Sequence, residues 1–363
     1  MPSFMYLAHF DSDSNLAYIP TEKHQVAASI SRKGSRTSYQ STRPPKKQRL
    51  IDHLKRFWAL HLVLWICITV LVVCLAIFVV VPVIAQRKVD DANYEIQGVN
   101  ILDPKPNSVL IQINSTIQTD GQVKAEVDSF EANLALANVP NAQPFMTLTF
   151  PKTNANKFQV VNISQIVEIA DQNALQQFNH ALFQNRTLRI TMYGKTSVKP
   201  AGMSKKYPVN VRKTIEFNGL NRLNGTKLQD TSLSLDRDAP NFNATAVIVN
   251  PSYYTLDMGN VTLQSFADGQ PVGNVAIANL LLRPGKNMFP IETRINQTRI
   301  AQIVENPAYC TTGNIPFKLQ GKRIQNHGED ITWLASSLSN ANMMVDVSIA
   351  AMMGSLESAN FCV

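Results

Sequence analysis

One short motif in this sequence has the residue types and spacing that could support metal-assisted chemistry. Asp236-Arg-Asp238 follows an alternating run and matches the Asp-x-Asp with which many membrane-anchored glycosyltransferases hold a divalent cation on a sugar nucleotide. Such enzymes alternate helices with parallel strands, whereas the residues around this motif are typical of short strands. The alternative, non-catalytic interpretation is a solvated turn before Ala239-Pro240, in which Arg237 screens both carboxylates.

The histidines offer little support for catalysis. Only His180 and His327 follow residue 90, and no His-x-x-x-His, Cys-x-x-Cys or Gly-x-Ser-x-Gly pattern accompanies them. We therefore predict structural or solvent roles for both, no catalytic residue, no metal site and no cofactor.

The four cysteines fall into two pairs. Cys67 and Cys74 lie in an apolar stretch, and Cys310 and Cys362 lie near the C-terminus. In an oxidising compartment, Cys310 and Cys362 could form one disulfide that ties the chain end to the last domain. The alternative is a pair of buried free thiols, and geometry decides between the two.

Residues 57–85 are predicted to form a transmembrane helix. They contain no Asp, Glu, Lys or Arg, and a helix over residues 62–85 would be about 36 Å long, more than the hydrocarbon core of a bilayer. Trp58 and Trp65 lie toward one end, where indole rings favour the interface. A cleaved signal peptide would lie closer to the N-terminus and be shorter, and a soluble helix this apolar is rare.

The flanking charges predict the orientation of that helix. Residues 1–56 carry ten Lys or Arg against four Asp or Glu, while residues 86–363 carry 24 against 22. An excess of Lys and Arg belongs on the cytosolic side, so residues 86–363 are expected to be luminal or extracellular. The basic juxtamembrane cluster consists of Arg43, Lys46, Lys47, Arg49, Lys55 and Arg56.

Glycosylation sequons agree with this orientation, because all of them follow the predicted span. They begin at Asn114, Asn162, Asn185, Asn224, Asn243, Asn260 and Asn296.

Residues 1–56 are predicted to be a disordered basic tail, since they show no sustained apolar period. Their basic cluster could contact anionic lipid, or it could serve only to fix the topology. The nearly balanced charge of residues 86–363 argues against nucleic-acid binding.

The remaining sequence favours short strands separated by turns. Alternating runs begin near Val109, Gln122, Leu188, Ala244, Asn260, Val275, Phe317 and Val345, and Asp268-Gly269 marks a hairpin. Two helices are expected. One is capped by Asp171 and carries Leu175, Phe178 and Leu182 on one face; the other is capped by Asp330 and carries Trp333, Leu334 and Leu338.

A weak internal repeat indicates two related domains. Ser129-Phe130 and Ser265-Phe266 are 136 residues apart, and Asn114 and Asn250 share that offset. We predict tandem β-sandwich domains, each with a short helix, at residues 86–221 and 228–363.

The second half carries motifs of a known family. Asn250-Pro-Ser252, the run from Leu256 to Leu263 and the run from Leu282 to Asn287 resemble the late-embryogenesis-abundant type 2, or water-stress-hypersensitivity, domain. The whole layout, with the run from Ile215 to Asn221, is similar to fungal single-pass membrane proteins of domain-of-unknown-function family 3712. The first half fits less well, because Asn114 is followed by Ser-Thr instead of Pro-Ser.

The resemblance implies immunoglobulin-like or fibronectin-like sandwiches and no catalytic residues. It also implies a vacuolar, other endomembrane or plasma-membrane location, and in some relatives an apolar or lipid-like ligand. We therefore expect a non-enzymatic, type II, single-pass glycoprotein whose ectodomain binds a lipid-like ligand or a protein partner. A type II membrane enzyme such as a glycosyltransferase is the alternative, and a structural adaptor with a recruiting tail is a third interpretation.

Overall fold

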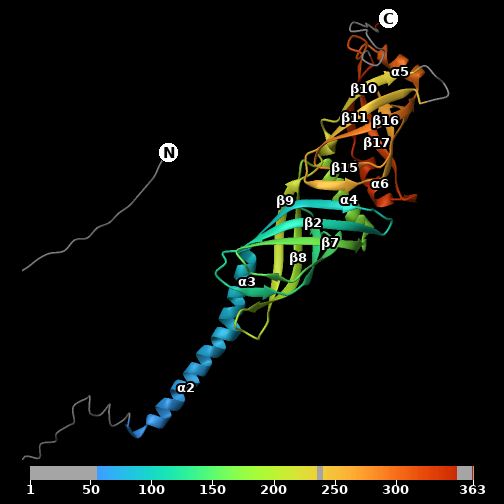
Figure 1. Cartoon of the computed structure of the whole chain (residues 1–363). Helices are drawn as coiled ribbons and strands as arrows, with labels where there is room; N and C mark the ends of the chain where they lie inside the picture. The colour runs from blue at the N-terminus through green and yellow to red at the C-terminus, as the bar shows by residue number, and fades with distance from the viewer. Residues whose placement is uncertain (1–54, 235–239, 350–361, 363) are drawn as a thin grey trace, which may run out of the picture. The chain divides into compact units, whose positions relative to one another are not determined.

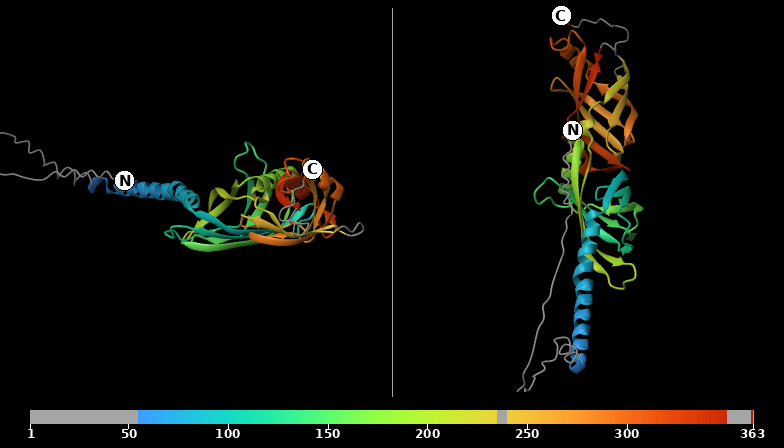
Figure 2. Two further views of the ribbon diagram at one scale, coloured as in Figure 1. Left: turned by 90° about the horizontal axis from the view of Figure 1, so that it is seen from above. Right: turned by 90° about the vertical axis from the view of Figure 1, so that its left-hand side faces the viewer.

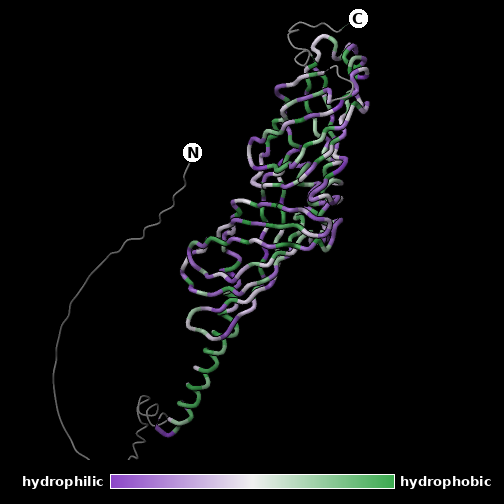
Figure 3. Tube along the Cα trace, turned by 45° about the vertical axis from the view of Figure 1, so that its right-hand side comes forward, coloured by the Kyte–Doolittle hydropathy of each residue, from purple (hydrophilic) through white to green (hydrophobic). Residues whose placement is uncertain are grey.

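The computed structural model of the chain describes residues 55–234, 240–349 and Cys362. Its first long element is a helix built from α2 (Trp58–Leu75), a π-helical segment η1 (Ala76–Val80) and α3 (Val81–Asp91). Within the described residues, this helix is the one long and apolar enough to cross a membrane. Figure 3 shows hydrophobic colouring along most of this helix. The apolar side chains of α2 are exposed, as lipid contact requires.

The helix continues past the predicted end at residue 85 to Asp91. The predicted span ended at residue 85 because charged residues follow it. Charged residues limit how much of a helix can lie in hydrocarbon, but they do not end the helix itself. Pro82 lies in the first turn of α3 and cannot donate a backbone hydrogen bond. The π-helical segment just before it is the usual kind of local adjustment.

The described strands form three sheets, so the chain is mainly β as predicted. The first sheet has the order β15-β12-β1-β2-β7. Its strands are β1 (Asn93–Leu102), β2 (Ser108–Gln118), β7 (Phe158–Glu168), β12 (Tyr254–Asp257) and β15 (Leu281–Leu282). Strand β1 pairs in parallel with β12, so residues more than 150 positions apart in the chain share this sheet.

The second sheet has the order β5-β4-β8-β3-β6, with β9 also paired to β8. Its strands are β3 (Ala125–Val127), β4 (Phe130–Leu136), β5 (Met146–Phe150), β6 (Thr153–Asn154), β8 (Thr187–Pro200) and β9 (Tyr207–Asn218). Strand β5 contacts β7 of the first sheet, so these two sheets meet along one side (Figure 1).

The third sheet has the order β10-β11-β16-β14-β13-β17, and β17 also pairs with β18 and β19. Its strands are β10 (Lys227–Leu233), β11 (Phe242–Asn250), β13 (Asn260–Ala267), β14 (Gln270–Ile277), β16 (Gly285–Ile295), β17 (Asn314–Asn326), β18 (Glu329–Asp330) and β19 (Met343–Ser348). Strands β10 and β19 are in contact, so the sheet curves back on itself. The predicted hairpin at Asp268-Gly269 is confirmed, and both residues have positive φ, as a type I′ turn requires.

Among the described residues, the sheets are accompanied by the helices α4 (Gln172–Gln184), η2 (Asn221–Leu223), α5 (Gln297–Val304) and α6 (Thr332–Ser339). The Asp171 cap is confirmed, because its carboxylate accepts a hydrogen bond from the Ala174 amide. The predicted Asp330 cap is wrong. The carboxylate of Asp330 instead receives two hydrogen bonds from the Arg323 guanidinium, and Ile331 occupies the cap position.

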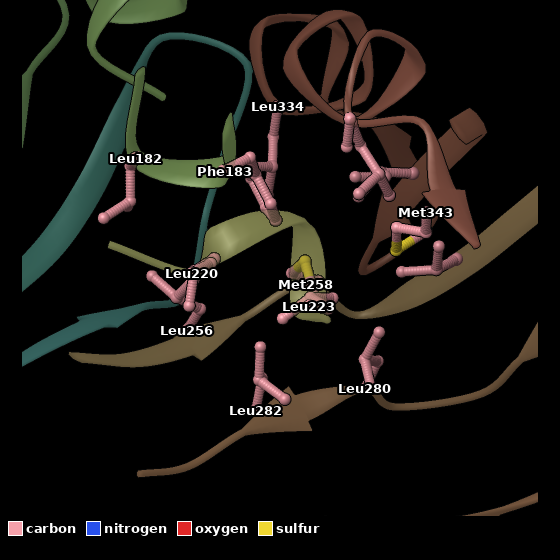
Figure 4. Close-up of a cluster of buried hydrophobic side chains, with 14 of the residues drawn as sticks. Leu182, Phe183, Leu220, Leu223, Leu256, Met258, Leu280, Leu282, Leu334 and Met343 are labelled. Carbon is pink, nitrogen blue, oxygen red and sulfur yellow. The ribbon is translucent and has the colours of Figure 1, made fainter. Parts of the chain in front are cut away.

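Helices α4 and α6 pack together, as both the first view and the turned views show (Figure 1, Figure 2). Both helices contribute to an apolar cluster drawn from both predicted domains (Figure 4). Figure 4 labels Leu182, Phe183, Leu220, Leu223, Leu256, Met258, Leu280, Leu282, Leu334 and Met343 of this cluster. A shared sheet and a shared core thus join residues on either side of the predicted boundary at 221–228, which stays a prediction.

Candidate ligand cavity beside the membrane helix

Helix α3 is bound along the outer edge of β9. The Gln86 side chain donates to the Asn210 carbonyl over 2.8 Å and accepts from the Asn210 amide over 2.9 Å. The Lys213 ammonium donates to the carbonyls of Asp90 and Ala92, at 2.5 Å and 2.6 Å, where the helix ends. These bonds pair the backbone groups of Asn210 on the open edge of β9, and they fix the end of the long apolar helix to the β-rich region.

A cavity of about 300 Å³ lies between α3 and the first two sheets. Its walls are largely apolar and come from elements distant in sequence, so the sequence alone could not reveal it. Representative wall residues are Ile84, Ala85 and Val89 of α3, Ile117 of β2, Ala125 of β3 and Val211 of β9. The volume is at the lower end of the roughly 300–1,000 Å³ found for small-molecule sites.

Aromatic side chains form the deep wall of the cavity. Tyr94 and Phe150 meet edge to face with ring centres 6.0 Å apart, and Phe130 stacks on Phe150 at 5.2 Å. Beyond Tyr94, Phe150 and Met192 lies a second apolar space of about 40 Å³, and these three side chains line both spaces. Burial raises the pKa of the Tyr94 phenol, so this wall is uncharged at neutral pH.

Three charged residues line the cavity: Lys88, Asp120 and Lys213. Lys88 and Asp120 form an ion pair, and the Lys88 ammonium holds the pKa of the Asp120 carboxyl below its usual range. Lys213 is half-buried and has no carboxylate partner among the described residues. Burial lowers the pKa of its ammonium, and the nearby charges of Asp90 and Asp91 oppose that effect.

Lys213 is the residue that sequence reasoning missed. It occupies the inward-facing row of β9, whose other members are Tyr207, Val209, Val211, Ile215 and Phe217. The sequence does contain a signal for it. A lysine is uncommon among the inward-facing apolar residues of a strand, so its presence there indicates a specific role.

The third sheet also encloses an apolar space, of about 60 Å³. That volume is too small for a lipid chain, so the interior of this sheet is essentially packed. Of the described spaces, the cavity beside α3 is the one with both an apolar wall and an unneutralised charge.

The predicted glycosylation sites all lie on the surface. The side chains of Asn114, Asn162, Asn185, Asn224, Asn243, Asn260 and Asn296 are exposed. Asn296 also caps α5 through its carbonyl oxygen, which leaves its amide nitrogen free of that bond. Asn114 and Asn162 are direct neighbours on β2 and β7.

The cysteines and the basic cluster are placed as follows. Cys310 and Cys362 are joined by a disulfide, with Cα atoms 4.8 Å apart, while Cys67 and Cys74 are free and exposed. Lys55 and Arg56 are exposed at the start of the described chain. The other four basic residues of the juxtamembrane cluster lie outside the described residues.

The remaining residues that the sequence suggested for catalysis or metal binding do not form a site among the described residues. His180 is exposed on α4, and His327 lies 3.2 Å from a carboxylate oxygen of Asp103. Asp236 and Asp238 lie outside the described residues. Within the part of the chain that the structure describes, no three His, Cys, Asp or Glu side chains gather as a metal site would require.

The Asn-Pro-Ser motif has a structural role. Asn250 is buried, donates to the Tyr254 carbonyl at 2.7 Å and accepts from both the amide and the hydroxyl of Ser252. These bonds close the turn between β11 and β12. They use the side-chain oxygen twice and the amide nitrogen once within this turn, so we assign Asn250 a structural role.

Solved structures resemble this chain only weakly. A target of the Northeast Structural Genomics Consortium is 13% identical, with 35% of this chain and 85% of that chain covered and a TM-score of 0.20. Red sea bream transglutaminase is 10% identical, with 70% and 30% covered and a TM-score of 0.21. The class 5 fimbriae chaperone CfaA is 12% identical, with 65% and 96% covered and a TM-score of 0.18. Likenesses at these scores support no inference about function.

A search of curated proteins found no match to this chain. A family model does match, over residues 143–265, which run from just before β5 into β13 and include all of β9. The matched family is described as "Protein of unknown function (DUF3712)", and this part of the chain is similar to it.

Proposed function

We propose that this chain is a non-enzymatic, single-pass membrane protein whose ectodomain binds a lipid-like ligand in the cavity beside α3. The cavity carries the proposal, because its wall combines the end of the membrane helix with the apolar faces of the first two sheets. Burying hydrocarbon there gains roughly 0.8 kcal/mol per methylene group.

The hairpin between β8 and β9 supports a position of this cavity at the membrane interface. The Lys205 ammonium lies 3.7 Å from the centre of the Phe78 ring. An ammonium group belongs in the polar headgroup region, so Phe78 marks one limit of the hydrocarbon core. From Trp58 to Phe78 the helix is about 30 Å long, which matches that core. Lipid could then enter the cavity without crossing water.

The proposal is tested by filling the cavity with a larger side chain. The full chain is purified in detergent, and bound lipid is measured by native mass spectrometry and by lipid extraction. We expect wild type to retain lipid that Val211→Trp loses, since the indole occupies space at the wall. Val123→Trp, just before β3, tests the same space from another side.

Val160→Trp is the matched control, because Val160 is exposed on β7 and lies outside the cavity. Lipid around α2 is common to all variants, so only the difference between them reports the cavity. Equal lipid in Val211→Trp, Val123→Trp and Val160→Trp would contradict the proposal and favour a protein partner instead.

The finer features follow the sequence resemblance and form part of the proposal. We propose a type II orientation, with residues 1–56 cytosolic, and an endomembrane location such as the vacuole, or the plasma membrane. The ectodomain would consist of tandem immunoglobulin-like or fibronectin-like sandwiches of late-embryogenesis-abundant type 2 character, as in fungal relatives. Exposure of all seven sequon asparagines supports glycosylation in this orientation.

N-glycosidase treatment tests the orientation. Full-length protein in membranes from a glycosylating host should shift to higher gel mobility after treatment, because the sequons would have faced the glycosylating lumen. A chain in which the sequon asparagines are replaced by Gln should show no shift. An unchanged mobility of wild type would indicate the opposite topology.

A further inference from the structure

Lys213 presents an unneutralised charge to the cavity described above. Its ammonium has three donors, and the carbonyls of Asp90 and Ala92 use two of them. The described residues give it no ion pair, although it is half-buried and lines a largely apolar space. A cation in such a place is costly unless an anion or further acceptors compensate for its lost water.

The charge of the cavity wall is therefore positive. Lys88 and Asp120 neutralise each other, which leaves a net charge of +1 on Lys213. The negative charges of Asp90 and Asp91 act on Lys213 from nearby, but neither side chain lines the cavity. Asp90 also accepts a hydrogen bond from Gln86, which holds one of its oxygens on the helix.

The Lys213 side chain lies next to the apolar interior of the cavity. Lys213 pairs in register with Met192 of β8, and Met192 borders both the main cavity and the smaller space behind it. A ligand with its polar end at Lys213 would thus have its hydrocarbon directed along Met192, Tyr94 and Phe150. About 300 Å³ suits one such chain better than two.

We propose that the ligand is an anionic amphiphile, with one hydrocarbon chain in the cavity and a carboxylate or phosphate on the Lys213 ammonium. This inference rests on the proposed function and adds the chemistry of the head group. A charge-assisted hydrogen bond in a partly desolvated place favours the anion over a neutral head group by roughly 10-fold to 100-fold.

The test compares head groups on one hydrocarbon chain. The full chain is reconstituted in phosphatidylcholine nanodiscs at mildly alkaline pH. Palmitate, lysophosphatidate and hexadecanol are added, each carrying a photoreactive diazirine on its chain. Intact mass after illumination gives the bilayer mole fraction at which labelling is half-maximal. Labelling that Val211→Trp abolishes is counted as cavity binding.

For wild type we expect half-maximal labelling by palmitate or lysophosphatidate at a mole fraction at least about 10-fold lower than for hexadecanol. The better of the two anions distinguishes a fatty acid from a lipid phosphate. In Lys213→Met the half-maximal mole fraction of the anion should come close to that of hexadecanol measured in the same variant. Lys213→Arg should keep most of the preference for the anion.

Lys213 also holds the end of α3, so its substitution removes those two hydrogen bonds, and two controls address this. Lys195→Met removes an exposed lysine from neighbouring β8 and should keep the full preference. Asp120→Asn retains Lys213 and frees Lys88, so it should strengthen the preference for the anion.

The outcomes separate the two proposals. Equal labelling by all three ligands in wild type, or an undiminished preference in Lys213→Met, overturns the anionic head group but leaves the lipid cavity standing. If no labelling depends on Val211, the proposed function itself fails.

Discussion

Trp333→Ala is expected to lower the free energy of unfolding by about 3–5 kcal/mol, the usual cost of deleting a large buried aromatic side chain. Trp333 lies on α6, is only 2% exposed and is the largest of the fully buried side chains. Its indole N–H donates to the Lys105 carbonyl at 3.0 Å, a bond that spans 228 positions of the chain. The substitution therefore opens a cavity where the two halves of the ectodomain meet and also removes a hydrogen bond across that junction.

The measurement is guanidinium unfolding of the full chain in detergent, followed by far-ultraviolet circular dichroism. Trp333→Phe should cost less than Trp333→Ala, because it keeps most of the packing and loses the hydrogen bond, worth about 1 kcal/mol. Phe158→Ala is the matched surface control, since the Phe158 ring on β7 is 57% exposed. A similar midpoint for Trp333→Ala and Phe158→Ala would show that the junction does not contribute to stability.

Reduction of the Cys310–Cys362 disulfide is expected to cost about 4 kcal/mol on the chain-entropy model, because the bond closes a loop over a sequence separation of 52. Cys310 is buried in the turns between α5 and β17, so the bond ties Cys362 to these turns. The expected result is a lower unfolding midpoint in reductant and the same lower midpoint for Cys362→Ser without it.

Cys67→Ser and Cys74→Ser provide the control, because both cysteines are free and lie on the apolar helix. Each should keep the midpoint of wild type and its sensitivity to reductant. If reductant lowers the midpoint of Cys362→Ser as much as that of wild type, the effect comes from elsewhere and the expected stabilisation is absent.

These two predictions concern the part of the ectodomain that is tightly packed. The junction of α4 and α6 is filled by large apolar side chains, and the third sheet encloses little free volume (Figure 4). The cavity beside α3 differs, since it combines free volume with a lysine on the inward face of a strand. Ligand binding is therefore expected near the membrane helix, and the other half is expected to stabilise the fold.

The sequence by itself determined the local features of this protein. The apolar run, the alternating strands, the Asp268-Gly269 hairpin and the Asp171 cap all depend on neighbours a few residues apart, and short-range patterns report such neighbours well. The same reasoning failed at Asp330, because its carboxylate turned to Arg323 on an adjacent strand.

Only the tertiary structure decided where the halves join and where a ligand would fit. The parallel pairing of β1 with β12, and the Lys105 carbonyl under Trp333, depend on contacts across more than 150 residues. The cavity depends on the same kind of contact, since its walls come from a helix and two sheets that meet only after folding. A lysine in an apolar row of a strand reads as an irregularity in the sequence. It becomes a candidate ligand contact only once α3 covers that strand and removes water from its ammonium.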